Sequence, residues 1–266
     1  MSNIAVEHAP SGLVRTSVVA REAISPHVVR VTLGGGDLPL FEFKGFDQWF
    51  RLAIPVHDAD RFDNLPSTFA LGGYLRYLAL PKATRPEIRN YTARAWRASP
   101  ARLDIDFLQH GDHGVAGPWA ATVEPGAEVA LIDQGCGWKD PGADWRLLAG
   151  DETAMPAIAG ILRDMPRDAV GHAFIELFDA RDRQPLDAPD AVRVHWLERS
   201  PGAAPGDALL PAVRALEFPP GRVYAFAAGE SAIAAGVRRH LVSERDVPKN
   251  DVTFCSYWKR SATVHA

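Results

Sequence analysis

Residues 147–158 read Leu-Leu-Ala-Gly-Asp-Glu-Thr-Ala-Met-Pro-Ala-Ile, and this order of residue types decides the fold of the second half of the chain. The apolar residues before Gly150 predict a buried strand, and Gly150 with Asp151 predicts a tight turn. Pro156 is tolerated only in the first turn of a helix, so a helix must begin close to it. A helix N-terminus directly after the first strand of a parallel sheet is a common site for a nucleotide phosphate, although the Gly-x-Gly-x-x-Gly pattern is absent here.

The same alternation of strand and helix continues to the end of the chain. The sequence predicts strands at residues 145–149, 172–178, 193–197, 223–227 and 252–257, and helices at 153–165, 207–216 and 231–244. Ser231 is the expected N-cap of the last helix. Strands that alternate with helices predict a Rossmann-like parallel α/β domain, which we assign to residues 143–266.

The first half of the chain has a different rhythm. Short apolar runs alternate with polar residues and are separated by glycine, proline and aspartate turns. The expected strands are residues 13–20, 28–33, 49–54, 89–96, 103–108 and 128–132. Short strands at this spacing predict an antiparallel β-barrel, which we assign to residues 1–142. The stretch 55–86 is expected to be a loop or an irregular insertion.

The composition excludes several classes of function. The chain has 266 residues, enough for two small domains, and a formal net charge of -4, which argues against a general nucleic-acid binder. Its two cysteines lie far apart and form no Cys-x-x-Cys pair, which excludes an integral iron–sulfur cluster and fits a reducing cytoplasm. We find no signal peptide and no apolar stretch long enough to span a bilayer, so we expect a cytoplasmic protein without membrane insertion. Any redox chemistry therefore needs a bound cofactor.

Residues 89–94 read Arg-Asn-Tyr-Thr-Ala-Arg and carry the most informative pattern of the first half. On a strand, Arg89 and Tyr91 share one face, while Thr92 and Arg94 share the other. A flavin needs an aromatic ring against its isoalloxazine, a cation for its pyrophosphate and a small hydroxyl near N5, where hydride arrives. Tyr91, Arg89 and Thr92 can supply these groups in that order, which places Tyr91 and Thr92 at the reacting centre. The alternative is an edge strand that merely covers the barrel, because the motif by itself is short.

Two segments downstream favour the flavin interpretation. Asp106, which we expect among the cofactor-binding residues, begins a run that ends a strand in a polar turn. In that turn His110 is expected to contact the cofactor or to be a structural histidine. A glycine-rich run from Gly114 through Ala116 to Trp119 predicts a turn and one helical turn. Its exposed backbone N–H groups can hold a pyrophosphate.

The same polar turn also raises the question of a metal site. His110, Asp112 and His113 are all possible ligands. Three ligands within four loop residues would need unusual backbone geometry, so we expect no metal there.

The turn after the first α/β strand offers candidates for binding a nicotinamide nucleotide. Gly150 and Asp151 form the turn, and Thr153 is the more natural donor to a phosphate or to the nicotinamide. Asp151 and Glu152 would oppose a phosphate placed directly on them. Helix capping by these two carboxylates is an equally good interpretation.

Ala228, Gly229 and Glu230 repeat the strand–turn–helix pattern at a later strand. Ligands gather at the carboxyl ends of such strands, so this turn is expected to face the nicotinamide. A solvated helix cap is the alternative.

The choice between NADPH and NADH depends on the residues after the second α/β strand. Arg181 and Arg183 could accept a 2′-phosphate, which favours NADPH. Asp179 and Asp182 beside them favour NADH or simple surface pairing.

Taken in order, these segments resemble the siderophore-interacting protein family, which are NAD(P)H-dependent ferric-siderophore reductases of the ferredoxin-reductase-like fold. The resemblance covers nearly the whole chain and rests on the following residues: Asp47-Gln48, Leu52, Pro55, Arg89–Arg94, Asp106, His110-Gly111, Gly114–Ala120, Gly150–Pro156, Trp196–Arg199, Ala228–Glu230, Arg238–Leu241 and Tyr257-Trp258. Where many relatives carry Gly-Pro-x-Gly, this chain has Gln134-Gly135-Cys136-Gly137. Tyr257-Trp258 is followed by Lys259-Arg260-Ser261 instead of the commoner basic-then-glycine ending.

The resemblance implies FAD in the barrel, held by Arg89, Tyr91, Thr92, His110 and the Gly114–Trp119 turn, with the nicotinamide nucleotide in the C-terminal domain. It also implies hydride transfer to the flavin near Thr92 and one-electron steps to the ferric iron of a siderophore, which needs no protein ligands.

An anionic ferric siderophore needs a basic pocket beside the flavin. The candidate cations are Lys44, Arg51, Arg94, Arg97, Lys259 and Arg260, each of which could instead be a solvated surface charge. Two alternative functions stay open. One is a general NAD(P)H:flavin or ferredoxin-type reductase, and the other is a non-catalytic siderophore- or flavin-binding protein.

Overall fold

The structure is a computed structural model that describes residues 2–7, 10–57, 60–68, 71–109 and 114–260. The chain divides into two compact units. The barrel unit is Val6–Cys136, and the α/β unit comprises Met1–Ala5 and Gly137–Ala266, of which the structure describes residues 2–5 and 137–260. The sequence placed the division at residue 142, whereas the structure moves it to residue 136 and gives the first five residues to the α/β unit.

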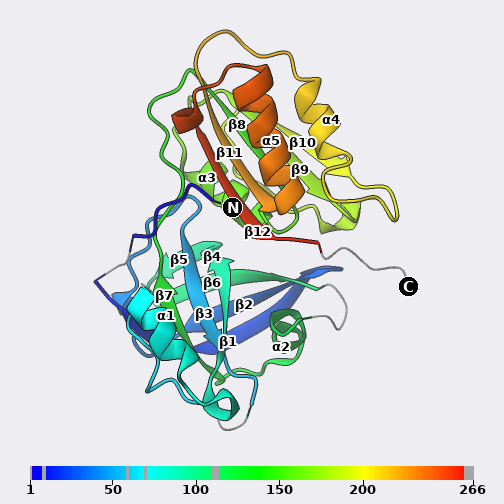
Figure 1. The fold of residues 1–266 in the computed structure, drawn as a ribbon. Coiled ribbons are helices and arrows are strands. Elements are labelled where there is room, and N and C mark those ends of the chain that lie inside the picture. Colours follow the sequence, from blue (N-terminus) through cyan, green and yellow to red (C-terminus); the bar gives the residue numbers. More distant parts are fainter. Residues whose placement is uncertain (1, 8–9, 58–59, 69–70, 110–113, 261–266) are drawn as a thin grey trace. The chain divides into compact units, whose positions relative to one another are not determined.

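The barrel unit contains one seven-stranded antiparallel sheet that curls into a barrel-like form (Figure 1). The order in the sheet is β4-β3-β7-β1-β2-β6-β5. The strands are β1 (Leu13–Ser25), β2 (Val28–Gly34), β3 (Trp49–Ile54), β4 (Glu87–Thr92), β5 (Ala95–Ala98), β6 (Ala101–Leu108) and β7 (Glu128–Asp133), with helices α1 (Leu71–Leu78) and α2 (Ala116–Thr122) and short 3₁₀ turns η1 (Leu38–Leu40) and η2 (Lys82–Thr84). The expected antiparallel fold of this half is confirmed.

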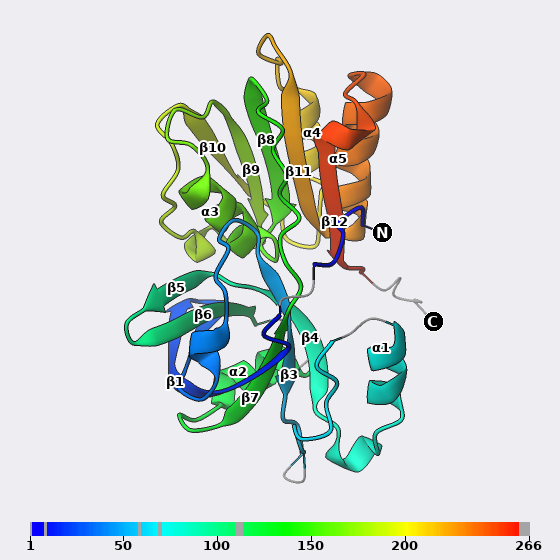
Figure 2. The same cartoon turned by 90° about the vertical axis from the view of Figure 1, so that its left-hand side faces the viewer.

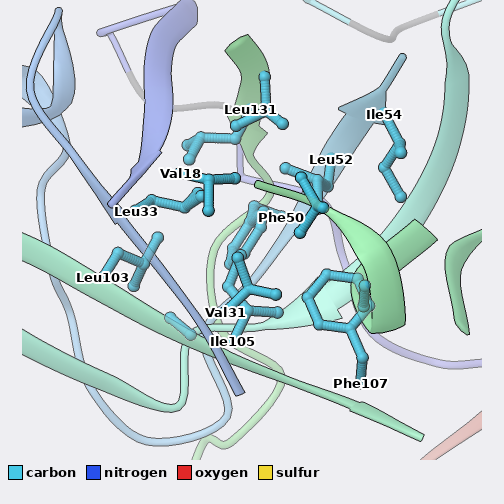
Figure 3. Packing of buried hydrophobic residues seen from close by; sticks show 14 of the residues in the cluster. Val18, Val31, Leu33, Phe50, Leu52, Ile54, Leu103, Ile105, Phe107 and Leu131 are labelled. Atoms are coloured by element: carbon cyan, nitrogen blue, oxygen red, sulfur yellow. The ribbon is translucent and has the colours of Figure 1, made fainter. Parts of the chain in front are cut away.

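Alternation of apolar and polar residues along these strands builds the core of the barrel unit. Phe50 and Leu52 on β3 and Leu103, Ile105 and Phe107 on β6 are fully buried and converge on one cluster (Figure 3). Successive side chains of a strand point to opposite faces, so a period of two in the sequence places all five inside. Burial of side chains of this size contributes roughly 1.5–3 kcal/mol each.

The segment expected as one strand over residues 89–96 is divided between β4 and β5. The backbone N–H of Ala93 donates to the carbonyl of Gln48, and that of Arg94 donates to the carbonyl of Asp104. The chain therefore leaves β3 and joins β6 between these two residues. One long strand was the wrong prediction because this exchange of partners depends on contacts that are distant in sequence.

The stretch 55–86, expected as a loop or an irregular insertion, contains α1 and η2. Tyr77 anchors α1, because its ring is buried in a small cluster with Phe62 and Leu65, and its hydroxyl donates to the carbonyl of Pro86 at 2.9 Å. Among the described residues, no helix is long and apolar enough to cross a membrane.

The α/β unit contains a five-stranded parallel sheet in the order β10-β9-β8-β11-β12. The strands are β8 (Trp145–Asp151), β9 (Gly171–Leu177), β10 (Val192–Glu198), β11 (Val223–Glu230) and β12 (Val252–Trp258). Helix α3 (Met155–Asp164) covers one face, while α4 (Leu209–Arg214) and α5 (Ser231–Glu244) cover the other (Figure 2). Short turns η3 (Ala180–Asp182) and η4 (Lys249–Asp251) complete the unit. The predicted Rossmann-like α/β fold is confirmed.

The order of the parallel strands creates a switch point between β8 and β11. From β8 the chain proceeds outward to β9 and β10, and from β11 it proceeds to β12 on the other side. Ligands bind at the carboxyl ends of strands beside such a switch. The sequence-predicted turns at Gly150 and Gly229 both lie at this edge.

The N-cap of α5 differs from the expectation. The helix already includes Ser231, so the capping residue is Glu230, whose side chain accepts a hydrogen bond from the backbone N–H of Ala232. Ser231 is therefore not the cap.

Contacts distant in sequence explain why the division of the chain differs from the expected one. Asn3 lies against the outer edge of β12, where its N–H donates to the carbonyl of Phe254 and its side-chain oxygen accepts from the N–H of Phe254. The backbone N–H of Lys139 donates to the hydroxyl of Tyr224 on β11 at 2.9 Å. Both segments therefore belong to the α/β unit.

Candidate functional site

A row of three aromatic rings lies where the sequence predicts a flavin site. Tyr91 on β4 contacts Phe107 on β6 with 4.3 Å between ring centroids, and Phe107 contacts Trp119 on α2 at 5.6 Å. The structure therefore brings together two segments that the sequence singled out separately. Burial raises the pKa of the Tyr91 phenol, so this hydroxyl stays protonated and neutral.

The register of β4 fixes the faces of the other predicted side chains. Arg89 and Tyr91 lie opposite Leu52 and Phe50, which are core-facing residues of β3, so the two share a face as expected. Thr92 lies on the other face and is buried. The expectation that Arg94 shares the strand face of Thr92 is wrong, because β4 ends at Thr92.

Arg89 keeps part of its hydrogen-bonding capacity. Its Nη1 atom donates to Glu87 Oε2 at 2.7 Å and to the carbonyl of Ile88 at 2.8 Å. A guanidinium has five N–H donors, so Nε and Nη2 remain available to an anion. The side chain is 43% exposed, which allows a phosphate to reach it.

Asp106 has a structural role within the barrel. Its carboxylate accepts hydrogen bonds from Arg30 Nε at 2.6 Å and Arg30 Nη2 at 2.9 Å, and Arg94 Nε lies 3.4 Å away. Both arginines are largely buried beside this single carboxylate. Asp106 is therefore paired with two guanidinium groups, and His110, which follows the same strand, lies outside the described residues.

The turn that leads into α2 suits the phosphate groups of FAD. Gly114 has φ +83°, which glycine adopts most easily, and a methyl group at Gly117 would lie 3.1 Å from the carbonyl oxygen of Leu108. Gln109 lies beside this turn, and its Nε2 atom is buried without a hydrogen-bond partner in the described part of the chain. An unpaired buried donor costs free energy, so an acceptor from a bound group would satisfy it. The local backbone and donor set fit the cofactor that the sequence predicts.

Two of the predicted substrate cations in the barrel unit have partners within it. Lys44 Nζ lies 3.6 Å from Asp133 Oδ2, and Asp133 also accepts a hydrogen bond from Gln48 Nε2 at 3.0 Å. Burial lowers the pKa of Arg51, which is close enough to Tyr74 of α1 to interact with it electrostatically. Together with Arg94, these cations are engaged by the barrel itself.

A buried carboxylate organises the switch-point edge of the α/β unit. Asp151 Oδ1 accepts from the backbone N–H of Thr153 at 2.9 Å and from its hydroxyl at 2.5 Å. Asp151 Oδ2 accepts from the backbone N–H of Glu230 at 2.7 Å and from Trp258 Nε1 at 3.1 Å. The side chain thus joins the ends of β8, β11 and β12. Burial raises the pKa of Asp151 even though these four donors favour its charged form.

Two glycines make room for this carboxylate. Gly229 has φ +116°, and a methyl group there would lie 2.5 Å from Asp151 Oδ1. A methyl group at Gly150 would lie 2.5 Å from Ala154 Cβ and 2.8 Å from the carbonyl oxygen of Ala228. The glycines of both predicted turns are therefore required for packing between the strands and the helix start.

The remaining acidic residues at this edge form a second chain of contacts. Arg199 donates to Glu152 Oε1 at 2.9 Å and to Glu176 Oε1 at 2.7 Å. Glu176 in turn accepts from the backbone N–H groups of Ala208 and Leu209, which satisfies the start of α4. Burial and the neighbouring Asp151 carboxylate raise the pKa of Glu152 to about 7, despite the ion pair with Arg199.

Neither Asp151 nor Glu152 caps helix α3. The residue at the N-cap is Ala154, which makes no side-chain cap. Thr153 donates its hydroxyl proton to Asp151, so it does not offer that proton to a phosphate or a nicotinamide. Its hydroxyl oxygen still has lone pairs that can accept a hydrogen bond.

The last described residues join the same edge. Glu230 Oε1 accepts a hydrogen bond from the backbone N–H of Arg260 at 3.0 Å. The side chains of Lys259 and Arg260 are exposed and form no ion pair with the described residues. Within the described residues, no carboxylate neutralises the charge of these two predicted substrate cations.

The two arginines after β9 that were predicted to contact a 2′-phosphate differ in whether their side chains are already paired. Arg181 is paired with Asp179 through several contacts, the shortest at 2.5 Å between Nη2 and Oδ2. Arg183 is exposed, and its side chain forms no ion pair or hydrogen bond with the described residues.

Sequence reasoning missed the side chains that hold the predicted ones in place. Phe107, Trp258, Arg199 and Glu176 received no role, although Trp258 and Arg199 belong to runs that carried the family resemblance. A signal was available for Trp258, because a parallel strand at the switch point must end close to the turns of its neighbours.

Comparison with known proteins covers both units. The model of the siderophore-interacting FAD-binding domain matches residues 17–137, and that of the siderophore-interacting protein matches residues 143–261. The ferric vibriobactin reductase ViuB of Vibrio cholerae is 33% identical over 93% of this chain and 90% of its own length. The NADPH-dependent ferric-chelate reductase of Escherichia coli is 28% identical over 91% of each protein.

Solved structures agree with these relationships. A siderophore utilization protein from T. fusca has a TM-score of 0.79 and 35% identity, with 97% of each chain covered. Ferredoxin-NADP+ reductase from Plasmodium falciparum has a TM-score of 0.64 at 10% identity and covers 96% of this chain and 100% of its own. The latter likeness shows the ferredoxin-reductase-like fold alone.

Proposed function

This chain belongs to the siderophore-interacting protein family, and from that premise we propose that it is an FAD-containing reductase that uses NAD(P)H to reduce the ferric iron of a siderophore. Relatives named as ferric reductases support an oxidoreductase role. The observation that carries the flavin part is the row of Tyr91, Phe107 and Trp119 beside the turn at Gly114, where Gln109 has an unpaired buried donor.

In this proposal the barrel unit binds FAD with the residues predicted from the sequence. Tyr91 supports the isoalloxazine, Thr92 lies near N5, and the free nitrogens of Arg89 pair with the pyrophosphate together with the backbone at Gly114 and Ala116. When bound, FAD accepts two electrons as hydride and releases them singly, which ferric iron requires. The protein's contribution is to bind the cofactor and orient it.

The α/β unit supplies the nucleotide site in this proposal. Asp151 fixes the turns at Gly150 and Gly229, so that the backbone at the switch-point edge presents a preformed surface to the nicotinamide. Arg183, which has no described partner, is the candidate contact for a 2′-phosphate and favours NADPH over NADH. Because Arg181 is paired with Asp179, it is the weaker candidate.

The substrate is an anionic ferric siderophore. Lys259 and Arg260 are the best candidates for contact with it, since Lys44, Arg51 and Arg94 interact with barrel residues. Reduction labilises the iron because hard oxygen ligands hold Fe(III) more tightly than Fe(II).

The deciding experiment follows the flavin spectrum of the purified protein. We expect a yellow protein with bound FAD that is bleached by NADPH without oxygen and recovers its colour when a ferric siderophore is added. Formation of Fe(II) is measured in the same sample with a ferrous chelator. A colourless protein that does not bind added FAD would contradict the proposal.

The same assay separates the alternatives. Equal or faster turnover with free flavin or ferredoxin, and none with ferric siderophores, would indicate a general reductase. Flavin that binds but is not reduced by NADPH or NADH would indicate a binding protein. An Arg183→Glu variant tests the donor: we expect its preference for NADPH over NADH to fall about tenfold, whereas Arg193→Glu should leave it unchanged.

A further inference from the structure

Helix α1 of the barrel unit presents four large apolar or aromatic side chains to solvent. Leu71, Tyr74, Leu75 and Leu78 are 76%, 47%, 58% and 46% exposed. They recur at i, i+3, i+4 and i+7, so they form one continuous stripe along the helix. Scattered exposed leucines are ordinary. A contiguous apolar stripe of this kind, in contrast, marks a surface that contacts a membrane or another molecule.

The orientation of α1 is fixed by contacts on a different side of the helix. Tyr77 is buried, and its hydroxyl donates to the carbonyl of Pro86. A methyl group at Gly73 would lie 1.8 Å from the carbonyl oxygen of Thr68, so this side of the helix lies directly against its neighbour. Arg85 Nη1 donates to the carbonyl of Leu78 at 3.0 Å and holds the C-terminal end. Rotating the leucines inward would break these contacts, so the stripe faces outward as a built feature.

The charged residues of the stretch that carries the stripe are of one sign. From Asn64 to Pro86 the chain has no aspartate or glutamate, although the whole protein has a formal net charge of -4. The same stretch carries Arg76, Lys82 and Arg85. Arg76 and Lys82 are exposed, and their side chains form no ion pair or hydrogen bond with the described residues. The stripe therefore lies in a stretch whose charged side chains are all basic, and Glu87, the first acidic residue after it, is paired with Arg89.

We propose that α1 is a membrane-surface element that rests on an anionic phospholipid bilayer, with the stripe of Leu71, Tyr74, Leu75 and Leu78 at the acyl boundary and Arg76 and Lys82 at the headgroups. Interfacial helices combine such an apolar face with cations, and each cation near an anionic surface adds to binding. Figure 2 shows α1 beside β4 at the outside of the barrel unit. A second copy of the chain fits less well, because an eight-residue helix offers little area and both copies would bring the same positive charge.

The test is co-sedimentation of the purified chain of 266 residues with vesicles. One set contains phosphatidylcholine alone, and the other contains phosphatidylcholine with phosphatidylglycerol. We expect binding to the anionic vesicles at low salt, with at least a tenfold weaker partition in 0.5 M salt or with neutral vesicles. No binding to the anionic vesicles, or equal binding to both kinds, would overturn the proposal.

Matched variants assign the binding to α1. Leu71→Ser/Leu75→Ser should weaken partition about tenfold or more, while Leu40→Ser, which removes a leucine that is 61% exposed elsewhere in the barrel unit, should change it less than about twofold. Lys82→Glu should weaken binding about fivefold, and Lys249→Glu of the α/β unit should have little effect. Retained vesicle binding in the double leucine variant would overturn the proposal.

Sedimentation velocity tests the alternative that a second copy of the chain covers the stripe. A dimer of the wild-type chain that becomes monomeric in the Leu71→Ser/Leu75→Ser variant, without vesicle binding, would assign the stripe to a second copy. Circular dichroism of each variant shows whether it is folded. Flavin reduction is not used as a readout, so the outcome is independent of the proposed reductase activity.

Discussion

The two units use their predicted site residues in opposite ways. In the barrel unit, Tyr91 and Trp119 come together through Phe107, and Arg89 keeps free donors. In the α/β unit, Thr153 donates its hydroxyl proton to Asp151, and Asp151 also accepts hydrogen bonds from the ends of two neighbouring strands. The predicted barrel side chains thus keep donors that no described residue uses, whereas the α/β edge uses its polar side chains to shape its backbone. A polar residue at a strand end can therefore hold neighbouring turns in place instead of staying available to a ligand.

The strongest test of this contrast is Asp151→Ala. Removing the acceptor leaves four donors at a buried edge, so we expect the α/β unit to lose about 3–5 kcal/mol of stability in urea unfolding. The exposed Asp190→Ala is the matched control and should change stability by less than about 0.5 kcal/mol. Asp151→Asn keeps one oxygen that accepts hydrogen bonds and replaces the other with an amide that only donates. If this variant is as stable as the wild type, the carboxylate does not organise the edge.

The second largest expected effect concerns Glu152 and the pH dependence of the free energy of unfolding. Its pKa is raised from 4.5 to about 7 in the folded protein, so its contribution to stability is complete below pH 4.5 and is lost as pH rises toward 7. Glu152→Gln does not titrate and should flatten the stability profile between pH 5 and 8 by up to about 3 kcal/mol. Denaturant unfolding at several pH values measures this, with the exposed Glu198→Gln as control. An unchanged profile would place the pKa of Glu152 near its ordinary value.

A smaller effect is expected in the barrel unit. Tyr91→Ala removes the ring beside Phe107 and should weaken FAD retention about tenfold to a hundredfold, while the α/β unit stays folded. Flavin content after gel filtration and fluorescence titration measure the loss. Tyr91→Phe keeps the ring and serves as control. Wild-type flavin content in Tyr91→Ala would remove the barrel site from the proposal.

The smallest effect concerns the exposed cations. Lys259→Glu should raise the KM for a ferric siderophore about twofold to fivefold without changing FAD content or stability, because exposed charges act weakly. Lys249→Glu controls for net charge. A change in the KM for the nicotinamide donor alone would assign Lys259 to the nucleotide instead.

Local patterns predicted most of the architecture. Pro156 located the start of α3, and the alternation around Phe50 and Leu103 located strands of the barrel, because both signals depend on neighbouring residues only. The break between β4 and β5 could not be predicted in this way. It arises because Ala93 still pairs with Gln48 while Arg94 already pairs with Asp104.

The candidate site shows the same contrast between local patterns, which sequence reveals, and contacts distant in sequence, which it does not. The turns at Gly150 and Gly229 were found from sequence because a strand, a glycine and a helix start are consecutive. The bond from Trp258 to Asp151 joins residues 107 positions apart, and no local pattern announces it. The exposure of Leu75 could not be predicted either, because the spacing of apolar residues on a helix is the same whether the stripe faces a core or the solvent.

The position of Asn3 on β12 has a consequence for how the protein is made. The barrel unit occupies Val6–Cys136, so it is enclosed in sequence by the two parts of the other unit. During synthesis the barrel can close once Cys136 has left the ribosome, since domains generally fold as units. Asn3 reaches its partners on β12 only after that strand has been translated. Asn3 is thus translated before the barrel unit but reaches its native partners after it.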